Sequence, residues 1–197
     1  MDRTGFGRQA GCANIRHNPF TSIAMESSVL STSGASDIQI QRFEPADQQG
    51  VIDVIVPIQR EEFGIAITAE DQPDLQAIPE FYQVGSGDFW VARKDGQIIG
   101  TIGLKDIGAQ QTALRKMFVA APFRGREFGV AASLLSTLLE EAGKRGVKDI
   151  YLGTTDKFLA AHRFYEKHGF VEVAKADLPE SFPVMKVDSK FYLLRRV

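Results

Sequence analysis

The chain has 197 residues, a length that suits one domain with an appendage. Its hydrophobic fraction of 44% and charged fraction of 24% are ordinary for a globular domain with a core, and its formal net charge of −2 argues against general nucleic-acid binding. No apolar run approaches the length that spans a bilayer, so we expect no membrane partner.

Metal-binding side chains are few. Cys12 is the only cysteine, which excludes an internal disulfide and a cysteine-based metal cluster within these residues. His17, His162 and His168 form no evident ligand set, so we predict no metal site. A single cysteine fits a reducing compartment, and we predict a cytoplasmic protein.

Residues 1–36 differ from the rest of the chain because serine and threonine are frequent and apolar periodicity is weak. Such a segment buries too little apolar surface to offset its ordering entropy, so we predict a disordered extension. Arg3, Arg8 and Arg16 leave a transit peptide as the alternative. The ordered domain is expected to cover residues 37–197.

The first half of the domain alternates between helical and extended patterns. A strand near residues 38–43 precedes a helix that starts at Glu44-Pro45 and should weaken at Pro57. An acidic connector over 61–73 and a short helix over 74–84 follow. Asp95-Gly96 predicts a hairpin between strands over 89–92 and 97–104, and a further strand is expected over 112–119.

The second half contains the clearest helix. Val130, Leu134 and Leu138 recur at helical spacing after residue 129 and predict an amphipathic helix. A buried strand is expected over 148–153, a helix over 157–168 that stops at Gly169, and strands over 170–173 and 190–194. This order of elements predicts an α+β fold with a mixed sheet.

The segment AAPFRGREFG, residues 120–129, lies between the strand over 112–119 and the amphipathic helix. A turn that opens a helix leaves backbone N–H groups unpaired at the positive end of the helix dipole, which suits a phosphate or pyrophosphate. Gly125 and Gly129 permit close approach, while Arg124 and Arg126 offer fork-shaped donors. The alternative is an ordinary surface turn with basic residues.

The strand ALRKMFV, the turn APFRGREFG, the following helix and the later FLAAHRFYEKHGF together resemble the GCN5-related N-acetyltransferase (GNAT) superfamily. The resemblance covers the chain from about Asp37 to Val197 in element order and is specific in the turn and in the helix that carries Tyr165. It implies a central, mostly antiparallel sheet in which two parallel strands splay apart, flanked by helices. The closing LPESFPVMKVDSKFYLL resembles a subset of the superfamily without an assigned substrate.

The resemblance also implies acetyl-CoA as the acetyl donor and co-substrate. Its pyrophosphate would lie on the turn, and its pantetheine arm would pair with the end of the preceding strand. The expected contacts are Met117, Phe118, Val119, Arg124, Gly125, Arg126, Glu127, Phe128, Gly129, Val130, Phe158 and Tyr165. Two of these positions depart from the family pattern: Glu127 replaces a glycine, and Phe158 replaces an asparagine. A carboxylate at Glu127 would repel a pyrophosphate unless it turns outward, toward Arg124 or Arg126.

Tyr165 matches the tyrosine that the family places near the sulfur, where a phenol can protonate a thiolate leaving group. Its alternative role is to pack a helix against the sheet. An ammonium acceptor must lose a proton before attack, and the carboxylates considered for this are Glu61, Glu62, Glu70, Asp71 and Asp106. Glu61 and Glu62 are the chosen candidates. We expect His162 to be a surface residue.

The sequence therefore predicts an N-acetyltransferase that binds acetyl-CoA and an amine, from a small molecule or a peptide, in one ternary complex with direct transfer. The alternative is a catalytically silent acyl-CoA-binding sensor or regulatory module, motivated by Glu127 and Phe158. A different acyl group is a third possibility. The apolar stretch over 182–194 and the exposed sheet edges make a homodimer possible.

Overall fold

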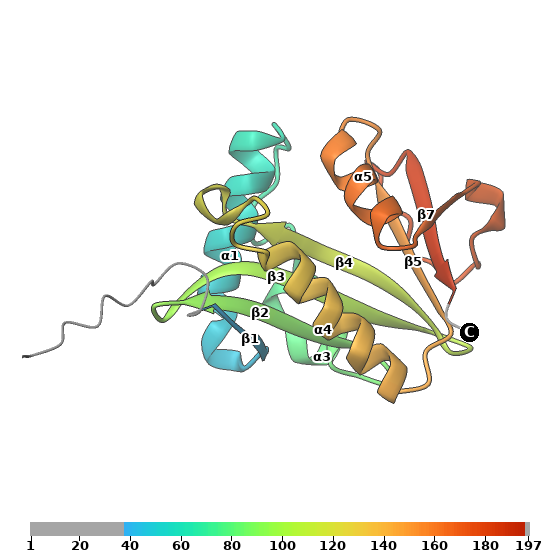
Figure 1. Ribbon diagram of the computed structural model, residues 1–197, viewed down its shortest axis with the longest axis horizontal. Helices are drawn as coiled ribbons and strands as arrows, with labels where there is room; N and C mark the ends of the chain where they lie inside the picture. The colour runs from blue at the N-terminus through green and yellow to red at the C-terminus, as the bar shows by residue number, and fades with distance from the viewer. Residues whose placement is uncertain (1–37, 196–197) are drawn as a thin grey trace, which may run out of the picture. The chain divides into compact units, whose positions relative to one another are not determined.

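The computed structural model describes residues 38–195, and the predicted N-terminal extension lies outside them. These residues form one seven-stranded sheet in the order β1-β2-β3-β4-β5-β7-β6 (Figure 1). The strands are β1 (Gln39–Arg42), β2 (Asp88–Lys94), β3 (Gln97–Gly108), β4 (Gln111–Val119), β5 (Asp149–Thr154), β6 (Val171–Val173) and β7 (Lys190–Arg195). Only the β4–β5 pair is parallel among these strands, so the predicted mixed, mostly antiparallel sheet is confirmed.

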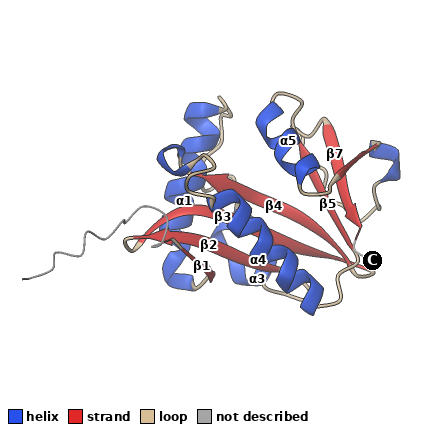
Figure 2. Ribbon diagram, in the orientation of Figure 1, coloured by secondary structure: helices blue, strands red, loops and turns tan. Residues whose placement is uncertain are grey.

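The helices cover both faces of the sheet (Figure 2). They are α1 (Gln48–Pro57), α2 (Pro73–Gln76), α3 (Ile78–Tyr82), α4 (Val130–Lys144) and α5 (Leu159–Lys167). We call the face covered by α4 and α5 the front face, where Leu134, Leu138 and Tyr165 pack on Ile102 and Leu152 in one core. The opposite, back face is covered by α1, α2 and α3.

The back face has two separate cores. The first, beneath α1 to α3, contains Phe43, Ile55, Leu75 and Phe89. The second contains Ala113, Tyr151, Phe182 and Phe191 and lies beneath the long loop before β7. In the apolar stretch over 182–194, Phe182 and Phe191 pack in this core, whereas Val184, Met185 and Val187 are exposed.

Three predicted helices have different limits in the structure. The helix expected over 74–84 is two short helices, α2 and α3, because Pro79 lacks an N–H and cannot continue α2. The first helix passes Pro57 and continues as a π-helical turn, Ile58–Glu62. Phe158 is the residue before α5 rather than a member of it.

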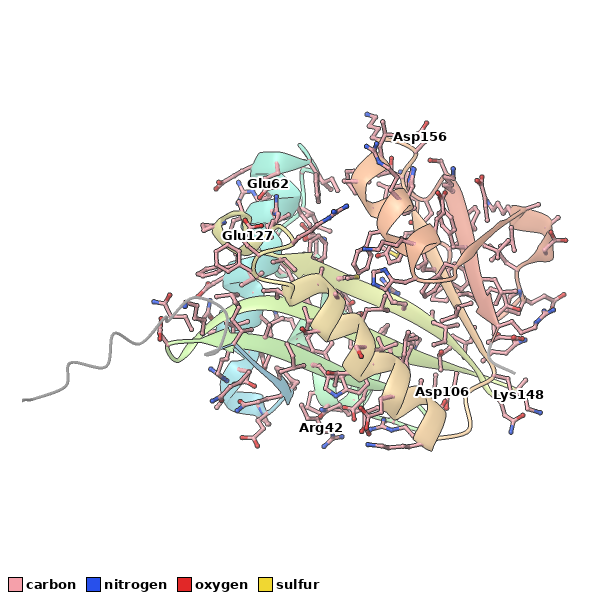
Figure 3. The ribbon with its side chains drawn as sticks, viewed as in Figure 1. Arg42, Glu62, Asp106, Glu127, Lys148 and Asp156 are labelled. Carbon is pink, nitrogen blue, oxygen red and sulfur yellow. The ribbon has the colours of Figure 1, made fainter. Side chains whose placement is uncertain are left out.

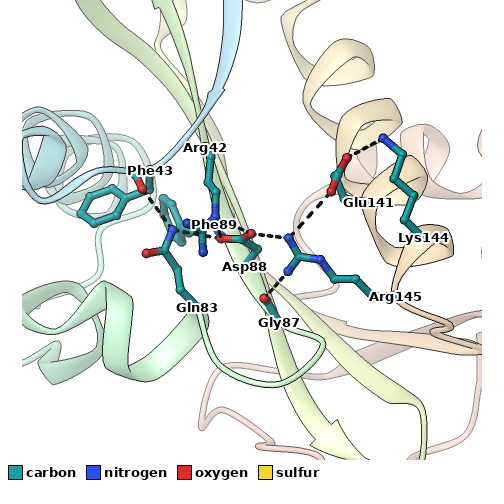
Figure 4. Close-up of polar contacts among 9 residues, drawn as sticks. All are labelled: Arg42, Phe43, Gln83, Gly87, Asp88, Phe89, Glu141, Lys144 and Arg145. Carbon is teal, nitrogen blue, oxygen red and sulfur yellow. Dashed lines mark hydrogen bonds and ion pairs between the residues drawn. The ribbon is translucent and has the colours of Figure 1, made fainter.

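A buried carboxylate joins three elements at the end of the sheet where β4 and β5 pair (Figure 4). Asp88, at the start of β2, is fully buried and accepts hydrogen bonds from Arg42 Nε at 2.7 Å, Arg145 Nη2 at 2.5 Å and Gln83 Nε2 at 2.9 Å. Burial opposes ionisation, but these donors outweigh it and lower the pKa of Asp88. The network ties β1 and the end of α4 to β2.

Within residues 38–195, we find no helix that is both long and apolar enough to cross a membrane.

Candidate active site

The two parallel strands separate after a short paired region. β4 pairs with β5 only from Gln111 to Ala113, opposite Asp149 to Tyr151. Figure 1 shows the two strands diverging from this end toward the turn before α4. Because β5 turns away, the edge of β4 from Leu114 to Val119 has no partner strand on that side among the described residues. We call this region the β4–β5 opening.

The turn after β4 presents free backbone donors. Gly125 (φ 116°) and Gly129 (φ 63°) have left-handed backbones that favour glycine. No backbone N–H of residues 125–128 or 130–132 donates a hydrogen bond to another described residue. Gly129 is the N-cap of α4, and no side chain caps the helix. The amides of a 15-residue helix are therefore available to an anion, which fits a pyrophosphate.

Glu127 occupies the same turn. Its carboxylate lies directly over Gly125, where the oxygens come within 2.6 Å of the position that a Cβ would take. It makes no ion pair with Arg124 or Arg126, the two partners that the sequence suggested for an outward orientation. Its backbone is not left-handed, so a residue other than glycine is accommodated there.

Arg124 has other partners, Glu62 and Val119. Its Nη1 and Nη2 donate to both carboxylate oxygens of Glu62, at 2.6 and 2.9 Å, and its Nε donates to the Val119 carbonyl at 2.6 Å. Glu62 lies on the π-helical turn (Figure 3). These bonds tie the Arg124 side chain to the end of β4 and to the π-helical turn.

A bulge in β4 sets the direction of the side chains beside the opening. Lys116 has a left-handed backbone (φ 52°), and the register with β3 shifts around it. Arg115 and Lys116 consequently both line a cavity on the back face, whereas Met117 packs into the front core. The Thr101 hydroxyl donates to the Lys116 carbonyl at 2.7 Å and supports this geometry. A strained non-glycine residue beside an opening is a feature typical of functional sites.

Tyr165 reaches the opening from the front face. It is 8% exposed, and among the described residues its hydroxyl donates only to Met117 Sδ, at 3.5 Å, a weak acceptor. Burial raises the pKa of Tyr165 above its usual range, so the phenol keeps its proton near neutral pH. A protonated donor with no strong acceptor lies beside the free edge of β4.

Two residues near α5 differ from the sequence expectation. His162 is buried, and one ring nitrogen lies 2.9 Å from the Thr155 carbonyl, so the expectation of a surface residue was wrong. The polar tip of the imidazole has a partner in the loop between β5 and α5, which allows the ring to be buried. Phe158 stacks on Phe63, with ring centroids 4.1 Å apart, and so connects α5 to the segment after the π-helical turn.

The cavity on the back face has a volume of about 370 Å³ and lies against β4, α2, α3 and the loop before β7. We call it the back-face pocket. Its polar residues include Gln59, Gln72, Asp74, Arg115 and Lys116, and Phe81 and Met185 are among its apolar ones.

Its buried charges are partly paired. Lys116 Nζ lies 2.5 Å from Gln72 Oε1 and 3.3 Å from Asp74 Oδ2, and the Tyr82 hydroxyl donates to the same carboxylate at 2.6 Å. Burial lowers the pKa of Lys116, while the Asp74 carboxylate opposes that shift. Asp74 thus has two close partners and is not free to act on a substrate.

Asp188 is a carboxylate that sequence reasoning missed. It lies against Gly153 of β5, where a Cβ would come within 2.4 Å of its carboxylate, and it accepts a hydrogen bond from the Met185 amide at 2.8 Å. Burial raises the pKa of Asp188, although the Met185 amide, Arg115 and Lys175 oppose the shift. Its position follows residues 185–187, which line the back-face pocket. Only its tertiary placement against Gly153 could have identified it.

The carboxylates predicted from sequence have other partners or positions. Glu61 is exposed, and both Glu61 and Glu62 line a different hollow, of about 630 Å³, along α1. The Glu62 carboxylate is occupied by Arg124. Asp71 accepts from the Thr68 amide and hydroxyl, and Asp106 accepts from the Ser86 and Gly108 amides.

Glu70 is also exposed, and hydrogen bonding, chiefly to backbone, lowers its pKa. Of the five carboxylates predicted from sequence, Asp71 is the one that lines the back-face pocket, and its carboxylate already accepts hydrogen bonds from Thr68. Among residues 38–195, no cluster of three or more His, Cys, Asp or Glu side chains could hold a metal ion.

Solved structures with the same fold are acetyltransferases. A GNAT-family acetyltransferase from Staphylococcus aureus Mu50 is 37% identical, with a TM-score of 0.75 over 80% of this chain and 98% of that chain. An acetyltransferase from Streptococcus agalactiae 2603 is 26% identical, with a TM-score of 0.77 over 82% of this chain and 99% of that one.

Among curated proteins, the N-acetylaspartate synthetase of Danio rerio is 34% identical over 106 residues, which are 53% of this chain and 37% of that protein. The matched part is therefore well under half of that relative's length. The model of the acetyltransferase (GNAT) family matches residues 52–170, which include the β4–β5 opening, the turn and Tyr165. The chain belongs to the acetyltransferase (GNAT) family.

Proposed function

We propose that this chain is an N-acetyltransferase that moves the acetyl group of acetyl-CoA directly onto an amine within a ternary complex. The observation that carries the proposal is the β4–β5 opening itself. It has a turn of free amides at its end, a protonated tyrosine on the front face and a polar pocket on the back face. Donor and acceptor can therefore reach one point from opposite faces of the sheet.

Binding of the donor is assigned to the backbone. The free amides of residues 125–128 and 130–132 would hold the pyrophosphate, and the unpaired edge of β4 up to Val119 would pair with the pantetheine amides. An N–H on the same edge would face the thioester oxygen and stabilise the oxyanion that forms during attack. Arg124 would join the pyrophosphate after leaving Glu62.

Proton transfers are assigned to two side chains. Asp188 accepts a proton from the ammonium form of the acceptor, and the neutral amine then attacks the thioester carbon. The C–N bond forms, the tetrahedral intermediate breaks its C–S bond, and Tyr165 gives its proton to the departing thiolate. The nitrogen then loses its second proton to the Tyr165 phenolate, and Asp188 releases the proton of the ammonium to solvent, which restores both groups. A buried aspartate with a raised pKa is a stronger base than an exposed one. Asp188 thus replaces Glu61 and Glu62 as the proposed base.

The proposal is tested by mixing the purified chain with acetyl-CoA carrying a labelled acetyl group and a panel of primary amines. We expect label in the amide product and release of one thiol for each amide formed. A single-turnover experiment without amine should leave no label on the protein, because transfer is direct. Tight binding of CoA in calorimetry without transfer to any amine would instead support the silent acyl-CoA-binding module.

A further inference from the structure

We propose that the back-face pocket recognises a carboxylate on the acceptor, with Arg115 as its main ligand, so that the preferred acceptor is an amine that also carries a carboxylate, such as an amino acid. This inference rests on the proposed function and specifies the substrate class of the same site. The acceptor's amine would lie at the β4–β5 opening and its carboxylate deeper in the pocket.

Arg115 is a half-buried cation whose ion pairing is loose. Its side chain is 15% exposed, and its nearest ion-pair oxygen, Asp74 Oδ2, is 4.0 Å away. Its Nη2 instead donates to Met185 Sδ at 3.2 Å. A guanidinium has five N–H donors that suit a carboxylate, and a thioether is a poor substitute for one. Arg115 is therefore poised to bind an anion in the pocket.

The other charges leave this cation unbalanced. The carboxylate of Asp74 is satisfied by Lys116 and Tyr82, and that of Asp71 by Thr68. Lys186 also lines the pocket and makes no ion pair with a described residue. Among the residues that line the back-face pocket, the two charges without a close ion-pair partner, those of Arg115 and Lys186, are both positive, which favours an anionic group on the acceptor. Asp188, which does not line the pocket, partly offsets the charge of Arg115.

The geometry also fits a small acceptor. Arg115 lies two residues before Met117, about 7 Å along a strand, so a carboxylate at Arg115 places a nearby amine close to the opening. The Phe81 ring packs against the guanidinium, 5.8 Å from its central carbon, and helps to orient it. A pocket of about 370 Å³ accommodates a molecule of amino-acid size.

The test compares L-amino acids with their carboxamides, which keep the amine and lose the negative charge. We expect kcat/KM to be at least about tenfold higher for the acids. Arg115→Gln should raise KM for the acids about 10- to 100-fold, because it removes a charge-assisted, bidentate hydrogen bond. It should leave KM for acetyl-CoA unchanged and should raise KM for the carboxamides far less than KM for the acids. Arg115→Lys should have an intermediate effect because it keeps the charge alone.

The matched control is Arg163→Gln, because Arg163 is exposed on α5 and does not line the back-face pocket. Far-ultraviolet circular dichroism verifies that each variant is folded. Equal kcat/KM for acids and carboxamides, or an unchanged KM in folded Arg115→Gln, would overturn this inference alone. Failure to acetylate any amine in the panel would instead overturn the proposed function, on which this inference rests.

Discussion

Tyr165 combines two properties that a general acid for a thiolate needs. It is protonated near neutral pH because burial raises its pKa, and its hydroxyl has only the Met117 sulfur as a partner. A phenol that is hydrogen-bonded to a strong acceptor in the resting protein would have to break that hydrogen bond before it could give its proton to the thiolate. The thioether of Met117 presents little such competition.

We therefore expect Tyr165→Phe to lower kcat about 100-fold, the low end of the range for a general acid. The dissociation constant of CoA should change less than about threefold, since the backbone carries that binding. Steady-state kinetics and calorimetry provide the two values. Tyr151→Phe, at a buried tyrosine of the other back-face core, is the control and should keep its kcat. A Tyr165→Phe enzyme with full activity would remove the phenol from the mechanism.

Asp188 leads to a prediction about pH. The charged groups that act on it are Arg115 and Lys175, and both lower its pKa, but burial has the larger effect and raises it above the usual value of about 3.9. The rate should therefore fall as the pH drops through this raised pKa, because the protonated carboxyl cannot accept a proton.

Asp188→Asn should lower kcat about 100-fold at pH 7 and remove this acidic limb from the pH–rate profile. An asparagine can still accept from the Met185 amide through its side-chain oxygen, so the loop should keep its conformation. Asp177→Asn, at an exposed position, is the control. If Asp188→Asn kept both the rate and the limb, another group would have to be the base.

At the scale of elements, the π-helical turn acts on the donor site. Ile58–Glu62 extends α1 beyond Pro57 and brings Glu62 against Arg124. A residue 62 positions earlier in the chain therefore binds one of the two arginines of the turn. A π-helical turn inside a longer helix is often found at functional sites. In this position it would compete with the pyrophosphate for Arg124.

We expect Glu62→Gln to tighten acetyl-CoA binding about two- to fivefold, the range for a solvent-accessible ion pair. Its kcat should stay within about twofold, since Glu62 is not the base in our proposal. Calorimetry measures the affinity, and Glu61→Gln on the same turn is the control. A large loss of kcat at unchanged affinity would instead restore Glu62 as the base.

Local sequence patterns were sufficient to predict most helices and strands, but not the residues of the proposed acceptor site on the back face. The Asp95-Gly96 hairpin, the amphipathic helix after Gly129 and the element order all follow from short-range periodicity and turn chemistry. The bulge at Lys116 does not, because it depends on register with β3 and on the Thr101 hydroxyl. Asp188 faces Gly153 only through a long loop, so no spacing in the sequence could indicate its burial.

At the scale of the described domain, the two ends of the sheet have opposite properties. Asp88 aligns with Leu104, and Leu104 with Leu114, next to the last residues of β4 that pair with β5. The network of Asp88 with Arg42 and Arg145 therefore lies at the closed end, away from the β4–β5 opening. Because buried polar contacts hold the sheet together at the end where β4 and β5 pair, these two strands can diverge at the other end while remaining in one sheet.

Asp88→Asn should therefore lower the free energy of unfolding by about 3 kcal/mol at pH 7, because two arginines lose a buried anionic partner. The lowered pKa of Asp88 means that its ionised form stabilises the fold above the usual aspartate range, and that this contribution disappears as the pH falls through the lowered value. Urea unfolding at a series of pH values should show wild type and variant converging in acid. Asp95→Asn in the exposed hairpin turn is the control and should differ little from wild type at any pH. A constant difference down to the most acidic folded condition would show that Asp88 acts through packing rather than through its charge.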